Sequence, residues 1–317
     1  MFNRLLHFDW SVRADKRWYG TALRTGDGWT IEPARPAPDD VLSLLFAQSD
    51  TFATLAGFDM PIGLPTAIRA SFPQGRFPEV LLELGQGAWQ TFFDVADHIT
   101  SVHPWRPFYP QRALRGQKQQ DLARALGVEH IDQLRRRCER AGHGSPAACP
   151  LFWTLGANQV GKAAIFGWRN ILQPAVRRGA HLWPFDGDLD TLAKQSGVVV
   201  CETWPAWAAR ALGLERNGYQ SKRKQLDRRD WCRQLLRQQK AVWYWESAAL
   251  DQMATGFGSR AWGEDAFDAM LGVLHMTSVV DGHHPEEYPE DPTLLNWEGW
   301  ILGRAGAVTW RRCSGGR

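Results

Sequence analysis

The stretch WGEDAFDAMLGVLHM, residues 262–276, decides the fold, because it predicts the helix around which the other elements are arranged. Its apolar residues recur at the i, i+3, i+4, i+7 spacing that gives a helix one apolar face: Phe267, Met270, Leu271 and Leu274. At about 100° per residue, Asp268 lies on the flank of that face, with Glu264 one turn before it. Asp265 points further out. We therefore expect the Asp268 carboxylate at the edge of the core.

Three other acids stand at the ends of short apolar runs, each of which predicts a strand. The runs are LLHFDWSV at 5–12, TLAGFDM at 54–60 and GVVVCET at 197–203. Asp9, Asp59 and Glu202 thus fall near the C-terminal ends of strands, where α/β sheets present their ligand sites. For each acid alone, capping of a turn or of the next helix is an equally good interpretation. His7 shares a strand face with Asp9 and is interpreted as a core histidine.

The order of the predicted elements gives an α/β fold. Apolar runs at 17–23 and 29–32 are split by the turn Gly26-Asp27-Gly28, so a meander of three strands is expected at the start of the chain. Further helices are predicted at 39–48, 78–85, 118–126, 131–140, 162–176, 206–212 and 221–240. Elements in this order form a mixed sheet flanked by helices. We expect one domain over residues 1–317, with a helical insertion at about 66–195.

The composition is that of a folded chain without a membrane span. Of the 317 residues, 44% are hydrophobic and 22% are charged, which is enough for a sizeable core. No run of eighteen apolar residues occurs, and Asp9 interrupts the N-terminal run that a signal peptide would need. We therefore expect a cytoplasmic protein. The five cysteines form no CxxC pair, so neither a zinc site nor a disulfide framework is indicated.

Together, Asp9, Asp59, Glu202 and Asp268 predict a divalent metal site. Two carboxylates about 4 Å apart repel by about 4 kcal/mol at an effective dielectric near 20. No lysine or arginine is adjacent in sequence to the strand-end acids, so a divalent cation is expected to offset this repulsion. Carboxylate oxygens favour Mg²⁺ or Mn²⁺ over zinc. A pair of such ions activates water and stabilises the leaving oxygen in phosphodiester cleavage.

Five short pieces carry a resemblance to a known family. They are FDW at 8–10, GFDMPIGLP at 57–65, VCETWPAWAAR at 200–210, EDAFDAM at 264–270 and EGWILG at 298–303. In these pieces the chain resembles a large bacterial family, domain-of-unknown-function family 429, whose members are described as predicted nucleases of the ribonuclease H-like fold. The resemblance extends over nearly the whole chain.

The resemblance implies a ribonuclease H-like fold and a metal-dependent nuclease. In that superfamily an acid on the first strand, an acid on a later strand and an acid on the last helix hold the metals. By motif position these are Asp9, then Asp59 or Glu202, then Asp268 or Asp265. The motifs leave open which member of each pair is the ligand. A non-catalytic binding protein of the same fold is the alternative.

Basic residues supply candidate contacts to a nucleic-acid substrate, either DNA or RNA. The segment 210–240 is rich in lysine and arginine, and its predicted helix carries Lys222, Arg223 and Lys224. Such a patch neutralises phosphates, although a solvated charged helix is an equally good interpretation. The net charge of +3 favours neither interpretation.

A competing motif, GANQVGKA at 156–163, is one residue away from the phosphate-binding loop GxxxxGK[ST]. Ala163 stands where a hydroxyl would hold Mg²⁺, which weakens a nucleotide-binding interpretation. Lys162 would otherwise contact an anion near the acidic site. The simplest interpretation is that Gly161 lets a helix pack closely. Neither GxSxG nor HExxH occurs, so a serine hydrolase or zinc protease has little support.

Overall fold

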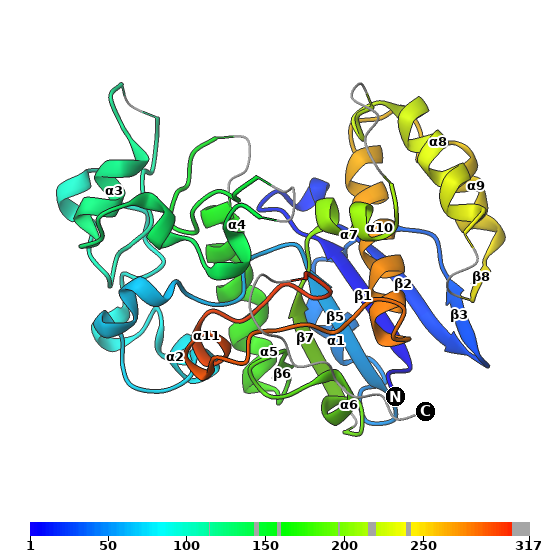
Figure 1. Ribbon diagram of the computed structural model, residues 1–317, viewed down its shortest axis with the longest axis horizontal. Helices are drawn as coiled ribbons and strands as arrows, with labels where there is room; N and C mark the ends of the chain where they lie inside the picture. Colours follow the sequence, from blue (N-terminus) through cyan, green and yellow to red (C-terminus); the bar gives the residue numbers. More distant parts are fainter. Residues whose placement is uncertain are drawn as a thin grey trace.

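A mixed β-sheet of eight strands forms the centre of the computed structural model, which describes residues 1–113, 115–142, 146–156, 160–195, 197–214, 220–238 and 242–305 (Figure 1). The strands are β1 (Arg4–Asp9), β2 (Trp18–Thr25), β3 (Gly28–Ile31), β4 (Arg35–Pro36), β5 (Ala53–Phe58), β6 (His181–Leu182), β7 (Gly197–Glu202) and β8 (Trp243–Trp245). Seven of them follow the order β6-β7-β5-β1-β2-β3-β8, and β4 pairs with β2. The predicted mixed α/β class is thus confirmed.

The described part of the chain contains eleven α-helices. They are α1 (Val41–Phe46), α2 (Phe77–Glu83), α3 (Gln119–Ala125), α4 (Val160–Gly167), α5 (Gln173–Arg177), α6 (Leu189–Leu192), α7 (Pro205–Ala211), α8 (Gln225–Leu236), α9 (Ser247–Ala254), α10 (Gly263–Val280) and α11 (Pro292–Trp297). Within the described residues, no helix is long and apolar enough to cross a membrane.

The strand directions bring three chain segments to one edge of the sheet. Strands β1, β2 and β3 form the expected antiparallel meander. Strands β5 and β7 run parallel to β1, with Phe8 opposite Phe58 and Phe58 opposite Glu202. The C-terminal ends of β1, β5 and β7 therefore lie side by side.

Side chains alternate between the two faces of the sheet, and each face has its own core. Leu5, Leu55 and Val199 belong to the core shared with α10. Their neighbours Leu6 and Ala56 belong to the opposite core, shared with the helices of the long segment between β5 and β7.

Helix α10 lies directly across β1 and β2 (Figure 1). A Cβ atom at Gly20 would lie 2.7 Å from the carbonyl oxygen of Ala269, and one at Gly272 would collide with the ring of His7. The two glycines therefore allow the helix and the strands to approach closely. Helix α7 also packs against α10. Every residue from Ala266 to Val279 is consequently buried, whereas the sequence indicated one apolar face.

Residues 66–195 are less helical than expected. The predicted helix at 131–140 is two short 3-10 turns, Ile131–Leu134 and Arg137–Glu139. The predicted helix at 162–176 forms, but a π-helical turn at Trp168–Leu172 separates α4 from α5. Strand β6, within the same segment, joins the sheet beside β7.

Candidate functional site

Asp9 and Asp59 lie next to each other at the shared edge of β1 and β5. The backbone N–H of Asp59 donates a 3.0 Å hydrogen bond to the carbonyl oxygen of Phe8, and that of Thr203 donates a 2.9 Å bond to Phe58. Asp9, Asp59 and Thr203 therefore form the row that follows the last paired residues of the three strands. By strand alternation, the side chains of this row point to the face that α10 covers.

Asp268 reaches the same place from α10, and its side chain is buried. Burial raises the pKa of Asp9 well above its usual range, and Asp268, Asp59 and Asp265 raise it further. Burial followed by Asp268 raises the pKa of Asp59 to about 7. The structure thus brings together three of the four acids that the sequence predicted.

Asp265 lies at the rim of this group, one turn before Asp268, and is half-buried. Burial raises its pKa to about 6, an effect that Lys16 opposes and Asp268 reinforces. We call Asp9, Asp59, Asp265 and Asp268 the carboxylate cluster.

Lys222 lies against the cluster and forms an ion pair with Asp268. Its Nζ atom is also 3.4 Å from Oε1 of Glu264. Burial lowers the pKa of Lys222, but Asp268 and Glu264 raise it by more, so its pKa lies above the ordinary value. A basic side chain therefore does contact the acids, although none is adjacent in sequence to the strand-end acids. The cation comes from a segment distant in sequence, which adjacency could not reveal.

The predicted basic helix at 221–240 was also wrong at both ends, because α8 spans only Gln225–Leu236. Lys222 lies in the turn before α8, where the buried Arg228 donates a 2.5 Å hydrogen bond to its carbonyl oxygen. That turn directs the Lys222 side chain to the acids. Arg223 and Lys224 are exposed, and Nε of Arg223 is 4.0 Å from Glu264.

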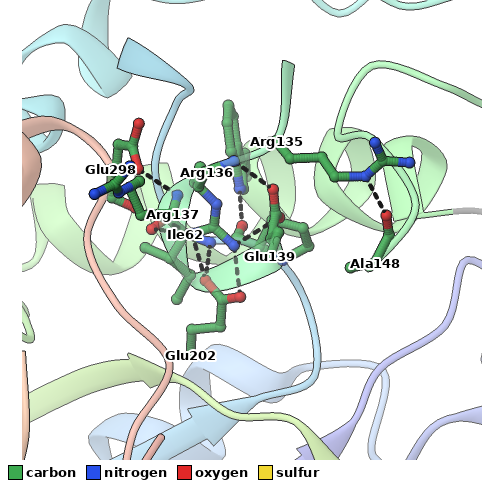
Figure 2. Close-up of polar contacts among 10 residues, drawn as sticks. Ile62, Arg135, Arg136, Arg137, Glu139, Ala148, Glu202 and Glu298 are labelled. Carbon is green, nitrogen blue, oxygen red and sulfur yellow. Dashed lines mark hydrogen bonds and ion pairs between the residues drawn. The ribbon is translucent and has the colours of Figure 1, made fainter. Parts of the chain in front are cut away.

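Glu202 ends its strand at the same edge but on the opposite face, because it precedes Thr203 by one residue. Both of its oxygens accept 2.6 Å hydrogen bonds from the guanidinium of Arg136, and the backbone N–H of Ile62 donates to Oε2 at 2.7 Å (Figure 2). Glu139 binds the same guanidinium at 2.8 Å. Burial raises the pKa of Glu202, and Arg136 opposes that shift. The structure therefore does not bring Glu202 into the carboxylate cluster.

Glu298 is a further buried acid that the sequence analysis did not single out, although it stands in the EGWILG piece. It is buried, and it accepts hydrogen bonds from the backbone N–H groups of Thr66 at 2.9 Å and Arg137 at 2.5 Å. A Cβ atom at Gly63 would collide with the backbone of Glu298. The GFDMPIGLP piece, which contains Asp59, is thus packed against the EGWILG piece.

The near-phosphate-loop lacks the structural context that nucleotide binding needs. Residues 157–159 lie outside the described residues. Before them, residues 151–155 form a turn and a single bridge from Trp153 to Tyr109 instead of a strand. A Cβ atom at Gly161 would lie 2.8 Å from the carbonyl oxygen of Leu151, so close packing explains this glycine. Lys162 is half-buried on α4 and is not among the charges that shift the pKa of Asp9, Asp59 or Asp268 most.

The cluster has a feature that suits a cation. Oδ1 of Asp268 and Oδ2 of Asp265 are buried and have no hydrogen-bond partner among the described residues. An unpartnered buried carboxylate oxygen is costly, and a hard cation would satisfy it. In the described part of the chain, however, no three His, Cys, Asp or Glu side chains are already arranged to hold a metal.

Comparison with known proteins gives one match. The sequence model of a family described as "Protein of unknown function (DUF429)" matches residues 13–293. No curated protein and no solved structure matches the chain.

Proposed function

The chain belongs to the DUF429 family of proteins of unknown function, and we propose that it is a ribonuclease H-like, metal-dependent hydrolase of nucleic-acid phosphodiester bonds. The observation that carries the proposal is the convergence of Asp9, Asp59 and Asp268 from two strands and a distant helix. These are the first-strand, later-strand and last-helix positions that the resemblance implies for metal ligands. The meander β1-β2-β3 followed by the parallel strands β5 and β7 supports the same fold.

Asp9, Asp59 and Asp268 would hold Mg²⁺ or Mn²⁺. Charge supports this assignment, because Lys222 pairs with Asp268 and Glu264, whereas no ion pair of Asp9 or Asp59 occurs among the described residues. Burial is the largest cause of the raised pKa of Asp9 and of Asp59, and Lys222 opposes the shift without cancelling it. Between the two open candidates for the middle ligand, we assign Asp59, since Arg136 occupies both oxygens of Glu202.

When bound, the metal would supply the activation of water and the stabilisation of the leaving oxygen. Asp265 is the carboxylate best placed to accept a proton from the attacking water, because it lies at the rim and its pKa is raised to about 6. Lys16 and Arg223 are exposed and lie near Asp265 and Glu264, and Lys224 is exposed next to Arg223 in the chain; these side chains would bind substrate phosphates.

The test is cleavage of labelled single- and double-stranded DNA and RNA with Mg²⁺ or Mn²⁺. We expect the wild type to cleave at least one substrate and Asp9→Asn and Asp268→Asn to lose about 10²-fold or more. Asp230→Asn is the matched control, since Asp230 is exposed on α8 and pairs with Arg233 away from the cluster. Equal cleavage by wild type and Asp9→Asn, or none with any substrate, would refute the proposal.

One observation favours the alternative of a non-catalytic protein with this fold. The ion pair of Lys222 with Asp268 gives the acids a partner without any metal. In such a protein the cluster would be structural, and bound nucleic acid would remain intact. Binding of the same oligonucleotides without cleavage is the outcome that selects this alternative.

A further inference from the structure

Lys222 is held in place by contacts of its backbone as well as by its ion pair. The guanidinium of Arg228, only 2% exposed, donates to the carbonyl oxygen of Lys222 at 2.5 Å. The same guanidinium donates to the carbonyl oxygens of Gly256 at 2.9 Å and Gly258 at 2.7 Å. These bonds hold the turn against the segment that leads into α10. The backbone of the turn therefore orients the Lys222 side chain towards Asp268.

The side chain of Lys222 is partly open to solvent. It is 30% exposed, whereas the side chain of Asp268 is 6% exposed. Rotation about the flexible stem of a lysine moves the ammonium group by several ångströms without any change in the backbone. The ammonium group can therefore leave the acids for solvent while Arg228 keeps the turn in place.

The ion pair satisfies only half of the Asp268 carboxylate. Lys222 contacts Oδ2, whereas Oδ1 is buried and has no partner among the described residues. Asp9 and Asp59 are influenced by the lysine charge but form no ion pair with it. A single ammonium thus occupies a site whose acids offer more oxygens than it uses.

We propose that Lys222 is a resident cation of the carboxylate cluster, which competes with a divalent metal ion for Asp268 and is displaced when the ion binds. This inference rests on the proposed function, because it concerns the same cluster. It assigns Lys222 a regulatory role: the metal-free site is closed by an internal charge. The measured metal affinity then depends on the difference between the free energies with which the metal ion and the Lys222 ammonium group bind the acids.

The test uses the full chain and Mn²⁺ alone, with affinity measured by calorimetry and by the spin-resonance signal of free Mn²⁺. Lys222→Met keeps the length of the side chain and removes the charge, so it should bind Mn²⁺ about tenfold more tightly or better. Lys222→Arg places a bidentate cation on Asp268 and should bind Mn²⁺ more weakly than the wild type. Lys194→Met, at an exposed lysine outside the cluster, is the control and should match the wild type.

The outcomes separate this inference from the nuclease proposal. If Lys222→Met binds Mn²⁺ more tightly than the wild type and Lys222→Arg binds it more weakly, the result supports both the resident-cation inference and the metal site of the nuclease proposal. If the wild type binds Mn²⁺ and Lys222→Met binds no better, the resident-cation inference is overturned while the metal site stands. If only Lys222→Met binds, the lysine replaces the metal in the native protein and the metal-dependent nuclease is overturned. If no variant binds, both are overturned. Should Lys222→Met fail to fold, the direction of the Lys222→Arg change decides.

Discussion

Asp9 and Asp59 end neighbouring parallel strands in the same row of the sheet, with the N–H of Asp59 bonded at 3.0 Å to the carbonyl that precedes Asp9. Two carboxylates in such a position repel, and among the described residues neither forms an ion pair with a basic side chain. Stability is therefore lost at this site, and the loss depends on pH and on bound cations. The first two predictions below follow from that relationship.

Asp59→Asn should stabilise the metal-free protein at neutral pH. The folded pKa of Asp59 is raised to about 7 from 3.8, so the folded state binds more protons than the unfolded state between these values. The contribution of Asp59 to stability therefore falls as pH rises from about 4 to 7. The variant should gain about 2 kcal/mol over the wild type at pH 8, allowing for the partial exposure of Asp59, and almost nothing at pH 4. Urea unfolding at the two pH values measures the difference; a gain that does not grow with pH contradicts the prediction.

Mn²⁺ should raise the melting temperature of the wild type. A ligand at 100 times its Kd stabilises the folded state by about 2.7 kcal/mol. Asp9→Asn and Asp268→Asn should lose this response, whereas the control Asp230→Asn should retain it. Thermal shift with and without Mn²⁺ provides the measurement, and an unchanged response in Asp9→Asn would remove Asp9 from the ligand set.

Glu202→Ala should destabilise the fold more than it affects metal binding. It leaves the buried Arg136 with Glu139 as its remaining carboxylate, and breaking a buried ion pair costs about 3–5 kcal/mol. Denaturant unfolding measures the loss, with Glu139→Gln as the milder comparison because Arg136 then keeps Glu202. At a temperature where Glu202→Ala is folded, its stabilisation by Mn²⁺ should match that of the wild type. Loss of that stabilisation would place Glu202 among the ligands after all.

Gly272→Ala should be severely destabilising, because the added methyl group collides with the His7 ring under α10. Forcing extra volume into a packed core costs about 1–3 kcal/mol or more. The double variant His7→Ala with Gly272→Ala removes the collision, so the two changes should be non-additive by more than about 1 kcal/mol. Additive losses in the double-mutant cycle would mean that the methyl group added at Gly272 does not occupy the space left by the His7 ring, and that α10 instead shifts away from β1.

Two buried histidines should make the protein acid-sensitive. Burial lowers the pKa of His7 and of His275 to about 3, from 6.5 when exposed. Below 6.5 the unfolded state binds more protons than the folded state, so stability falls as pH decreases from 6.5 towards 3. Each histidine should cost about 2 kcal/mol at pH 5 relative to neutral pH. His275→Gln should show a shallower loss between pH 7.5 and 5 in denaturant unfolding, and an unchanged slope would speak against a neutral buried His275.

The sequence was sufficient for features that depend on local periodicity. Alternating and continuous apolar runs predicted β1, β5 and β7, and the spacing of Phe267, Met270 and Leu274 predicted α10. It missed β8, since WYW at 243–245 is a three-residue strand that forms by parallel pairing with β3. The prediction of a helix at 131–140 failed because Arg136 is drawn into a tertiary network, in which its guanidinium binds Glu202, Glu139 and the carbonyl of Ile62.

For the candidate site, too, the sequence predicted some residues and could not predict others. Asp9, Asp59 and Asp268 could be named from their places at strand ends and on a helix flank. The separation of Glu202 from them could not, because a difference of one residue in the register of β7 decides which face its side chain occupies. The role of Lys222 was equally hidden, since its contact with Asp268 spans 46 residues.

The bond between Arg136 and Glu202 has an evolutionary consequence. Arg136 belongs to the long segment between β5 and β7, so in the described part of the chain that segment supplies the ion-pair partner of Glu202. A related chain that shortened the segment, or replaced the arginine, would retain a buried negative charge with no cation. We expect positions 136 and 202 to change together across related sequences, from a charged pair to an uncharged one, while positions 9, 59 and 268 vary independently of both.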